Sequence, residues 1–413
     1  MALVLPFKAI RPQRQYAAQV AALPYDVMTR EEAQKAVAGN DLSFMHVEKS
    51  EIDVPEGTRS DDELIYRTAR KNFDRLREKK ILLKEKSPCF YIYRQQMGAQ
   101  VQTGIVGVMS ALEYDEGKIK KHELTRKDKE EDRIRHVGTV NAHTGPVFIS
   151  YMARPRINTI VKKIVAGEPE YDFTAEDGII HTAWVVADAG QIEQIKKEFL
   201  QVDALYIADG HHRAAAAATV AGQRRKLDNI AGSTRESDMV LAVLFPHDQL
   251  KVMDYNRAVK DLNGLTPEKY LEKITVSFKV NKNYAAKSPQ KLHDFGMYLG
   301  GRWYKLTIKD GKYDVKDPVA SLDAAILQDH LLAPILGISD PRTNDRIKFV
   351  GGIRGMAELE KLVDKDDFAV AFSLHPTTME QIMQVADAGA IMPPKSTWFE
   401  PKLRSGMFVH DLG

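Results

Sequence analysis

The sequence predicts an α+β protein of two domains, and three observations support this. Segments typical of strands and of helices alternate along the chain, with no tandem repeat and no low-complexity linker. A chain of 413 residues, 44% hydrophobic and 28% charged, can bury one large core or two. The pattern changes after about residue 255, so we expect a catalytic domain over 1–260 and an additional α+β domain over 261–413.

The composition excludes several classes of protein. The 59 Lys and Arg residues nearly balance 57 Asp and Glu residues, so the chain lacks the basic surface typical of proteins that bind duplex nucleic acid. The single cysteine, Cys89, excludes an intramolecular disulfide and a cysteine-built zinc site, which fits a reducing compartment. No apolar stretch approaches the roughly 18 residues that span a bilayer, and the N-terminus lacks the features of a signal peptide. We therefore expect a cytoplasmic protein without a membrane or nucleic-acid partner.

Elements of the first third of the chain follow from local patterns. The apolar start, residues 1–8, is typical of a first strand. Thr29, followed by acidic residues, favours the start of a helix. Apolar residues at helical spacing over 61–80 predict a surface helix, and the β-branched and aromatic runs 89–94 and 102–109 predict a hairpin.

The middle of the chain begins with a highly charged stretch, residues 118–135. Its apolar content is too low to predict a buried element. Buried strands and a capped helix are predicted beyond it. The strands are at 146–151, 181–186, 205–208 and 239–245, and the helix is at 188–201.

In the last third of the chain, helices and one hairpin are expected. Asp310-Gly311 is a strong signal for a tight hairpin turn, here within 303–315. Helices are predicted near 267–271, 323–336 and 379–390.

The strongest chemical signal is a turn between a short buried strand and an alanine-rich helix. Unpaired backbone N–H groups at a helix N-terminus favour phosphate, and Gly210 allows close approach of the backbone. Arg213 can bind phosphate oxygens in bidentate fashion, and His211 and His212 can donate protons or hydrogen bonds. Asp209 could hold Mg²⁺ or orient a histidine. The alternative is an ordinary polar turn in which Asp209 caps the helix.

A second constellation, His122 to Thr125, lies in the charged stretch. The carboxylate of Glu123 could act as general base toward a hydroxyl acceptor if burial raised its pKa. The alternative is a solvated charge run, since such runs usually face solvent.

A third constellation, Lys395, Ser396 and Thr397, follows two prolines near the end of the chain. It lacks the glycines of a phosphate-binding loop. Its lysine and hydroxyls could still offer a cation to a phosphate donor, and a plain surface turn is the alternative.

The segment 209–213, Asp-Gly-His-His-Arg, resembles the nucleotide- or phosphate-binding turn of the ParB/sulfiredoxin-like superfamily. The wider set of motifs at 24–27, 122–125, 209–213 and 393–397 resembles a prokaryotic family of unknown function, over nearly the whole chain. The resemblance implies a ParB/sulfiredoxin-like mixed α/β core in the first domain. The superfamily includes kinases of free L-serine that use ATP, ADP or pyrophosphate.

This resemblance implies a phosphotransferase that makes phosphoserine. By similarity, Glu123 would deprotonate the serine hydroxyl, with Asp209, His211 and His212 as catalytic partners. His122 and Thr125 would contact the acceptor. Mg²⁺ would bind near Asp209. The donor would be bound by Gly210, Arg213, Lys395, Ser396 and Thr397. Because the chain has no Walker or protein-kinase glycine loop, pyrophosphate is favoured over a nucleotide as this donor.

Three other functions stay open: the reverse reaction, a nucleotide-dependent regulator, and a metabolite-binding protein without turnover. The same site could act in reverse on phosphoserine, as a phosphatase-type reaction. A ParB-like regulator that binds or hydrolyses a nucleotide is the alternative from another class, although no helix-turn-helix segment is evident.

Overall fold

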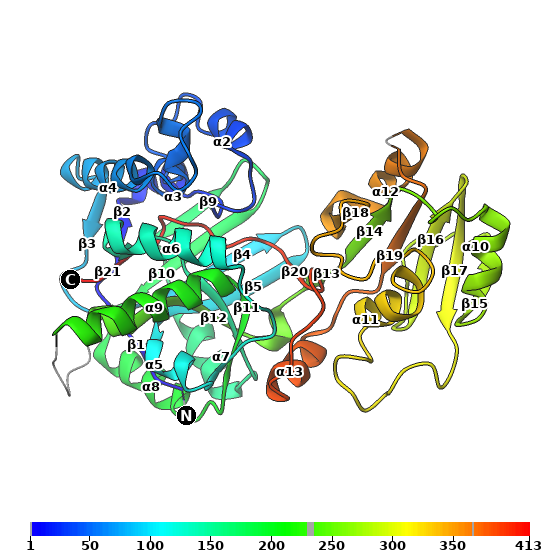
Figure 1. The fold of residues 1–413 in the computed structure, drawn as a ribbon. Coiled ribbons are helices and arrows are strands. Elements are labelled where there is room, and N and C mark those ends of the chain that lie inside the picture. Colours follow the sequence, from blue (N-terminus) through cyan, green and yellow to red (C-terminus); the bar gives the residue numbers. More distant parts are fainter. Residues whose placement is uncertain (1, 229–234, 366) are drawn as a thin grey trace. The chain divides into compact units, whose positions relative to one another are not determined.

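The chain forms two compact units, drawn in Figure 1. The first unit comprises Met1–Leu250 and Pro401–Gly413, and the second comprises Lys251–Glu400. The computed structural model describes three stretches of the chain, residues 2–228, 235–365 and 367–413. The predicted mixed α and β architecture is confirmed. Among the described residues, no helix is both long and apolar enough to cross a bilayer.

A nine-stranded mixed sheet forms the centre of the first unit. Its order is β6-β11-β8-β12-β5-β4-β10-β9, and β1 pairs with β5. Two neighbouring pairs, β6 with β11 and β8 with β12, are parallel, and the others are antiparallel. The strands are β1 (Val4–Leu5), β4 (Phe90–Met97), β5 (Gln100–Ser110), β6 (Ile119–Lys120), β8 (Val147–Tyr151), β9 (Tyr171–Thr174), β10 (Ile180–Val186), β11 (Leu205–Asp209) and β12 (Met239–Pro246).

Helices surround this sheet, and α9 packs on β8 and β12. The alanines of α9 are 0–6% exposed, because their small side chains let the helix lie close to the strands. The helices are α1 (Ala17–Val20), α2 (Arg30–Ala36), α3 (Met45–Glu48), α4 (Glu63–Glu78), α5 (Ala111–Asp115), α6 (Lys127–Val140), α7 (Pro155–Ile164), α8 (Ala189–Phe199) and α9 (His211–Asp228). Short 3₁₀ turns are η1 (Arg14–Tyr16), η2 (Ser50–Asp53), η3 (Glu236–Asp238) and η4 (His247–Gln249).

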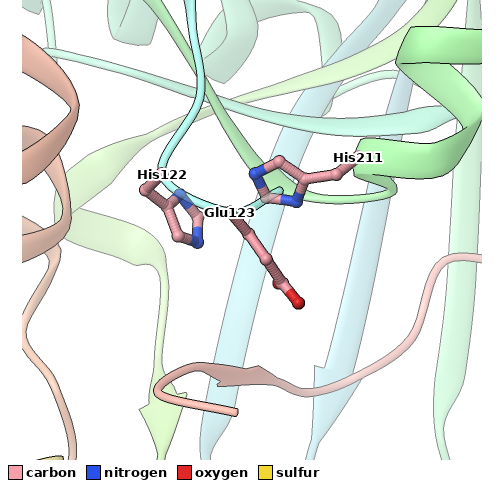
Figure 2. Close-up of side chains that lie close together, drawn as sticks. All are labelled: His122, Glu123 and His211. Carbon is pink, nitrogen blue, oxygen red and sulfur yellow. The ribbon is translucent and has the colours of Figure 1, made fainter. Parts of the chain in front are cut away.

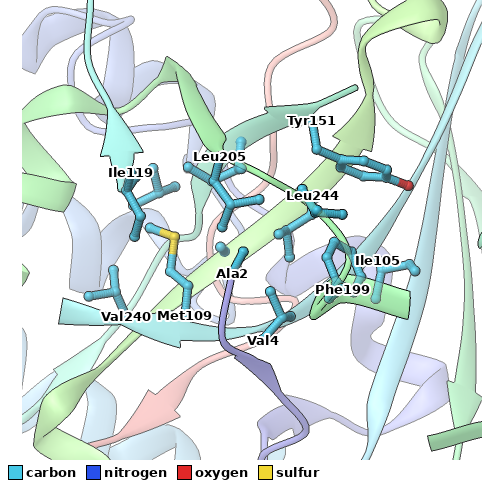
Figure 3. Packing of buried hydrophobic residues seen from close by; sticks show 14 of the residues in the cluster. Ala2, Val4, Ile105, Met109, Ile119, Tyr151, Phe199, Leu205, Val240 and Leu244 are labelled. Atoms are coloured by element: carbon cyan, nitrogen blue, oxygen red, sulfur yellow. The ribbon is translucent and has the colours of Figure 1, made fainter. Parts of the chain in front are cut away.

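The main core of the first unit lies between the sheet and its helices (Figure 3). Side chains of the central strands pack with those of α8 and α9, and Leu205, Leu244 and Phe199 are fully buried. This core holds β11 and the first turn of α9 in place. The turn 209–213, which the sequence singled out, joins these two elements.

The end of the chain returns to the first unit. Strand β21 (His410–Asp411) pairs with β7 (Ala142–His143), and β2 (Ile10–Pro12) pairs with β3 (Leu82–Lys84). Two backbone bridges, Ile10 with Val409 and Ala22 with Ser405, bind residues 401–413 to the N-terminal part of the unit. This segment therefore brings its side chains to residues that lie far from it in the sequence.

The second unit is built on a six-stranded sheet of order β15-β17-β16-β19-β14-β18. Its strands are β14 (Tyr255–Val259), β15 (Phe278–Lys282), β16 (Asp294–Leu299), β17 (Arg302–Ile308), β18 (Ile347–Gly351) and β19 (Val370–Leu374). A small pair joins β13 (Val252–Met253) and β20 (Trp398–Phe399). The helices are α10 (Pro267–Ile274), α11 (Asp323–Leu327), α12 (Gly355–Lys365) and α13 (Met379–Asp387), with a π-helical turn η5 (Gln328–Leu332) and a 3₁₀ turn η6 (Gly352–Arg354).

Most of the expected elements are present. The helix predicted at Thr29 begins there with a complete capping box to Glu32, and the surface helix predicted over 61–80 is α4. The hairpin expected from 89–94 and 102–109 is β4 and β5. Local sequence was sufficient here because caps and hydrophobic periodicity agree with the final packing.

Two expectations are wrong. The hairpin expected over 303–315 is absent from the described residues. Because β17 already pairs with β15 on one side and β16 on the other, it has no free side on which the residues after Ile308 could pair. The charged stretch 118–135 does contribute to a buried element, because helix α6 begins at Lys127 and buries Arg133 and His136. Charged side chains can be buried where ion pairs compensate them.

Candidate active site

The turn at Asp209 joins the end of β11 to the start of α9, as the sequence predicts. Gly210 has a φ of +89°, a left-handed conformation that favours glycine. This conformation reverses the chain direction between strand and helix and leaves His211 as the first helical residue. The backbone N–H groups of the first helical turn therefore lie at the end of a buried strand.

His122 and Glu123 come directly after β6, which pairs in parallel with β11. Ile119 lies opposite Leu205 and Lys120 lies opposite Tyr206, so both strands end at the same edge of the sheet. Residues 122–123 therefore reach the Asp209 turn, although 86 residues (209 − 123) separate them in the sequence. The rings of His122 and His211 meet edge to face, with centroids 4.6 Å apart.

Three side chains form the centre of this site (Figure 2). One ligand-type atom each of His122, Glu123 and His211 lies within 4.8 Å of the other two. His122 and His211 are 1% and 6% exposed, and Glu123 is half-buried. The structure therefore brings together the His-Glu pair and the Asp209 turn, the two constellations that the sequence singled out separately.

Burial keeps both histidines neutral near pH 7. It lowers the pKa of His122 to about 4, against the opposing effects of Asp209 and a hydrogen bond to the backbone of Ile207. Burial, together with His122 itself, lowers the pKa of His211 well below its ordinary value. These rings can accept or donate hydrogen bonds, but they do not serve as imidazolium acids near neutrality.

Asp209 is paired with a lysine that sequence reasoning missed. Nζ of Lys402 donates to Oδ2 of Asp209 at 2.8 Å, and the N–H of Gly210 donates to Oδ1 at 2.8 Å. Burial disfavours the charged carboxylate, but Lys402 and Gly210 outweigh it and lower the pKa of Asp209 to about 2. Asp209 is thus ionised at neutral pH. No local pattern could have identified Lys402, because it lies 193 residues from its partner.

His212 and Thr125 stabilise the loop that carries Glu123. The backbone N–H of Arg126 donates to Nε2 of His212 at 3.0 Å, which ties this loop to the first turn of α9. The hydroxyl of Thr125 donates to Oε2 of Glu130 at 2.6 Å. Both contacts orient the Glu123 loop, and roles for the two side chains toward a substrate remain predictions.

Arg213 points toward a buried ion-pair cluster. Its guanidinium donates to the carbonyl of Pro146 at 3.2 Å and to Oγ of Ser405 at 3.3 Å, and it lies 3.5 Å from Oε2 of Glu48. Arg133 lies 3.8 Å from the same carboxylate oxygen. Burial opposes ionisation of Glu48, but the two arginines help to lower its pKa. Sequence reasoning did not single out Glu48 or Arg133.

Lys395, Ser396 and Thr397 belong to the second unit and make their described contacts there. The carbonyl of Lys395 accepts from Arg257 at 3.0 Å, and its Nζ lies 5.7 Å from the ring centre of Tyr255. Oγ of Ser396 donates to the carbonyl of Pro393 at 2.7 Å. A role for this segment in donor binding remains a prediction.

Comparison with known proteins identifies the family of the chain and several solved structures with low similarity to it. A family model described as "Protein of unknown function (DUF1015)" matches residues 4–325, which include Glu123 and the Asp209 turn and end before Lys395. No curated protein matches the sequence.

Several solved structures match the chain at low similarity. A conserved hypothetical protein from Pyrococcus furiosus is 14% identical, with a TM-score of 0.33 over 70% of this chain and 90% of that one. A free serine kinase in complex with AMP is 14% identical, with a TM-score of 0.34 over 70% and 88%. SbnI from Staphylococcus aureus, truncated at its C-terminus, is 10% identical, with a TM-score of 0.38 over 73% and 85%. Scores this low establish no functional relationship, so the geometry of the site has to support any function.

Proposed function

This chain belongs to the DUF1015 family of unknown function, and we propose that it is a phosphotransferase that makes phosphoserine from free L-serine. The proposed donor is pyrophosphate, with ADP and ATP as the alternatives. The observation that supports this most strongly is the meeting of Glu123 with the start of α9. A carboxylate able to accept a proton thereby lies beside a helix N-terminus able to bind a phosphoryl group.

The reaction follows from this juxtaposition. Glu123 accepts the proton of the serine hydroxyl as the hydroxyl oxygen attacks the terminal phosphorus. A new O–P bond forms, the bridging P–O bond breaks, and the leaving phosphate departs with its electron pair. The protein then acts mainly by positioning and by stabilising charge, as is usual in phosphoryl transfer.

Positive charge at the site comes from two sources. The N–H groups that open α9 point toward the turn at Gly210, and Lys402 lies beside Asp209. In the proposed complex, phosphate oxygens share Lys402 with Asp209. Asp209 and the neutral ring of His211 orient the groups around the donor, and His122 and Thr125 lie on the acceptor side.

Mg²⁺ fits this proposal as a companion of the donor. Asp209 is anionic at neutral pH, but Lys402 contacts one of its oxygens and the N–H of Gly210 contacts the other. Asp209 therefore offers at most one carboxylate ligand, and donor phosphates would supply most of the rest, as is common for Mg²⁺. The ion would neutralise charge on the donor.

The proposal also assigns the residues that bind the donor, the fold of the first unit and the cellular compartment. We assign Gly210, Arg213 and the segment 395–397 to donor binding, and we regard the first unit as a ParB/sulfiredoxin-like core. Serine and a phosphoryl donor are both dissolved metabolites, so the proposed place of action is the cytoplasm. Phosphoserine could also be the substrate, because the same groups serve the reverse reaction.

A donor screen tests the proposal. Purified protein is incubated with L-serine, Mg²⁺ and pyrophosphate, ADP or ATP in turn, and phosphoserine is measured by mass spectrometry. We expect phosphoserine with at least one donor. No phosphoserine with any donor, and no release of phosphate from phosphoserine, would refute the proposed function.

A further inference from the structure

The cluster of His122, Glu123 and His211 has the composition of a metal site. Two imidazoles and one carboxylate are the ligand set of many zinc and non-haem iron centres, which leave further positions open for water or substrate. Magnesium prefers oxygen ligands, so the companion ion of a phosphate donor would not be expected at this set. We propose that these three side chains bind a divalent transition-metal ion, of the Zn²⁺ class, in addition to any ion carried by the donor.

The spacing of the three groups supports this inference. Their ligand atoms lie within 4.8 Å of one another. In a tetrahedral zinc site with bonds of ~2.0–2.1 Å, ligand atoms are ~3.3 Å apart. His122 lies two residues after β6 and His211 is the first residue of α9, and the half-buried side chain of Glu123 would have to move to close the remaining gap. Figure 2 shows the rings of His122 and His211 near each other, with the side chain of Glu123 extending past them.

A second observation concerns the histidines individually. Nε2 of His211 is buried and, among the described residues, has no hydrogen-bond partner. A buried nitrogen without a hydrogen-bond partner is unfavourable, and a bound metal ion would satisfy it. The ring of His122 is hydrogen-bonded to the backbone of Ile207, and metal-binding histidines are commonly oriented by such a bond to a backbone carbonyl.

The electrostatic surroundings also favour a cation. Asp209 adds a negative charge close to both rings, although Lys402 partly balances it.

This inference goes beyond the proposed phosphotransfer and does not depend on it. A metal ion bound by Glu123 would occupy the carboxylate that accepts the serine proton. The two roles of Glu123 therefore compete, and the ion would act as an inhibitor of phosphotransfer.

Direct titration tests the site. Chelator-treated, full-length protein without serine or phosphoryl donor is titrated with Co²⁺, followed by visible absorption, and with Zn²⁺, followed by calorimetry. We expect one saturable site with Co²⁺ ligand-field bands. Loss of a group that only hydrogen-bonds to a metal ligand costs ten- to a hundredfold in metal affinity, so loss of a ligand itself in His122→Ala or His211→Ala should cost at least about tenfold.

Controls distinguish a missing ligand from a damaged fold. His330→Ala removes a histidine of the second unit that is not in the cluster, and this variant should bind metal as the unaltered protein does. Glu123→Gln is nearly isosteric, so it should fold and still lose affinity. Absence of saturable binding, or unchanged affinity in both His211→Ala and Glu123→Gln, would overturn the proposal. Because the titration contains no substrate, its outcome is separate from that of the donor screen.

Discussion

At the scale of single residues, the contact between Lys402 and Asp209 links the end of the chain to the candidate site. The proposed reaction uses Lys402 to stabilise charge on the transferred group. Removing one group of this kind typically costs about 10²–10³ in rate. Lys402→Met should therefore lower kcat/KM for phosphoserine formation by about 10²-fold, as measured by mass spectrometry. Lys402→Arg keeps the charge and should retain most of the activity, and an unaltered rate in Lys402→Met would contradict the assignment.

His181 should make the fold sensitive to acid. Burial, followed by the charge of Arg404, lowers its pKa from 6.5 to about 3. Between these values the unfolded chain binds a proton that the folded protein does not. The free energy of unfolding therefore falls as pH drops from 6.5 to 3, by up to about 1.4 kcal/mol per pH unit.

A glutamine at this position removes the titration while keeping polar atoms near Tyr93 and Arg404, which both contact the ring. Between pH 7.5 and pH 5, His181→Gln should lose about 2 kcal/mol less than the unaltered protein. Chemical denaturation at the two pH values measures this. At pH 7.5, the difference in free energy of unfolding between the two proteins measures how the substitution changes packing. Equal losses of unfolding free energy between pH 7.5 and pH 5 in both proteins would contradict the prediction.

Sequence reasoning singled out the residues of the candidate site better than their partners. Glu123, Asp209 and His211 were recognisable because each belongs to a short motif. Lys402 and Glu48 were not, because their roles exist only after residues distant in sequence have come together. Such partners carry no local pattern.

At the scale of elements, the junction of β11 and α9 depends on the conformation of Gly210. A Cβ there would meet Val147 Cα at 3.6 Å, which is ordinary contact, so the cost of an alanine is its left-handed backbone. Gly210→Ala should lower the free energy of unfolding by about 1–2 kcal/mol. It should also lower phosphotransfer, because the first turn of α9 would shift.

Gly138 provides a matched control for this change. It lies inside helix α6, and no atom lies within 4 Å of a Cβ built on it. Gly138→Ala should therefore stabilise the protein by about 0.5–1 kcal/mol, through the higher helix propensity of alanine. Denaturant unfolding should therefore show a lower free energy of unfolding for Gly210→Ala and a higher one for Gly138→Ala. Changes of the same sign in both variants would contradict this prediction.

Periodic and capped elements were predictable, whereas elements decided by tertiary pairing were not. Thr29 and Asp188 both cap the helices that the sequence assigned to them. Helix α6 was obscured because its buried face includes Arg133 and His136, whose partners lie on other elements. Asp310-Gly311 is a good turn signal, but β17 has neighbours on both sides and leaves no edge for a hairpin.

At the scale of the whole molecule, the first unit is made of two separate stretches of sequence. Residues 401–413 supply Lys402 and pair with strands and loops of the N-terminal 250 residues. The sequence alone could not reveal that residues 401–413 belong to the first unit. No local pattern distinguishes this segment from a C-terminal tail of the second unit. The sequence did indicate a change of pattern near residue 255, close to where the second unit begins.

Removing the second unit tests whether the first unit folds without it. A chain in which a flexible Gly/Ser linker replaces residues 251–400 keeps the main core and Lys402. We expect cooperative thermal unfolding followed by circular dichroism. If Lys395 binds the donor, phosphotransfer should be lost. Failure to fold would contradict the independence of the first unit, and full activity would contradict the role of Lys395.

The central claim is that Glu123 accepts the proton of a hydroxyl that is being phosphorylated. The most direct measurement compares phosphoserine formation and donor binding in the unaltered protein, Glu123→Gln and the control Glu131→Gln, which lies on the exposed face of α6. If Glu123 accepts this proton, Glu123→Gln should lose about 10²-fold or more in rate while still binding the donor, and Glu131→Gln should be unaffected. Equal rates in Glu123→Gln and the unaltered protein would contradict it.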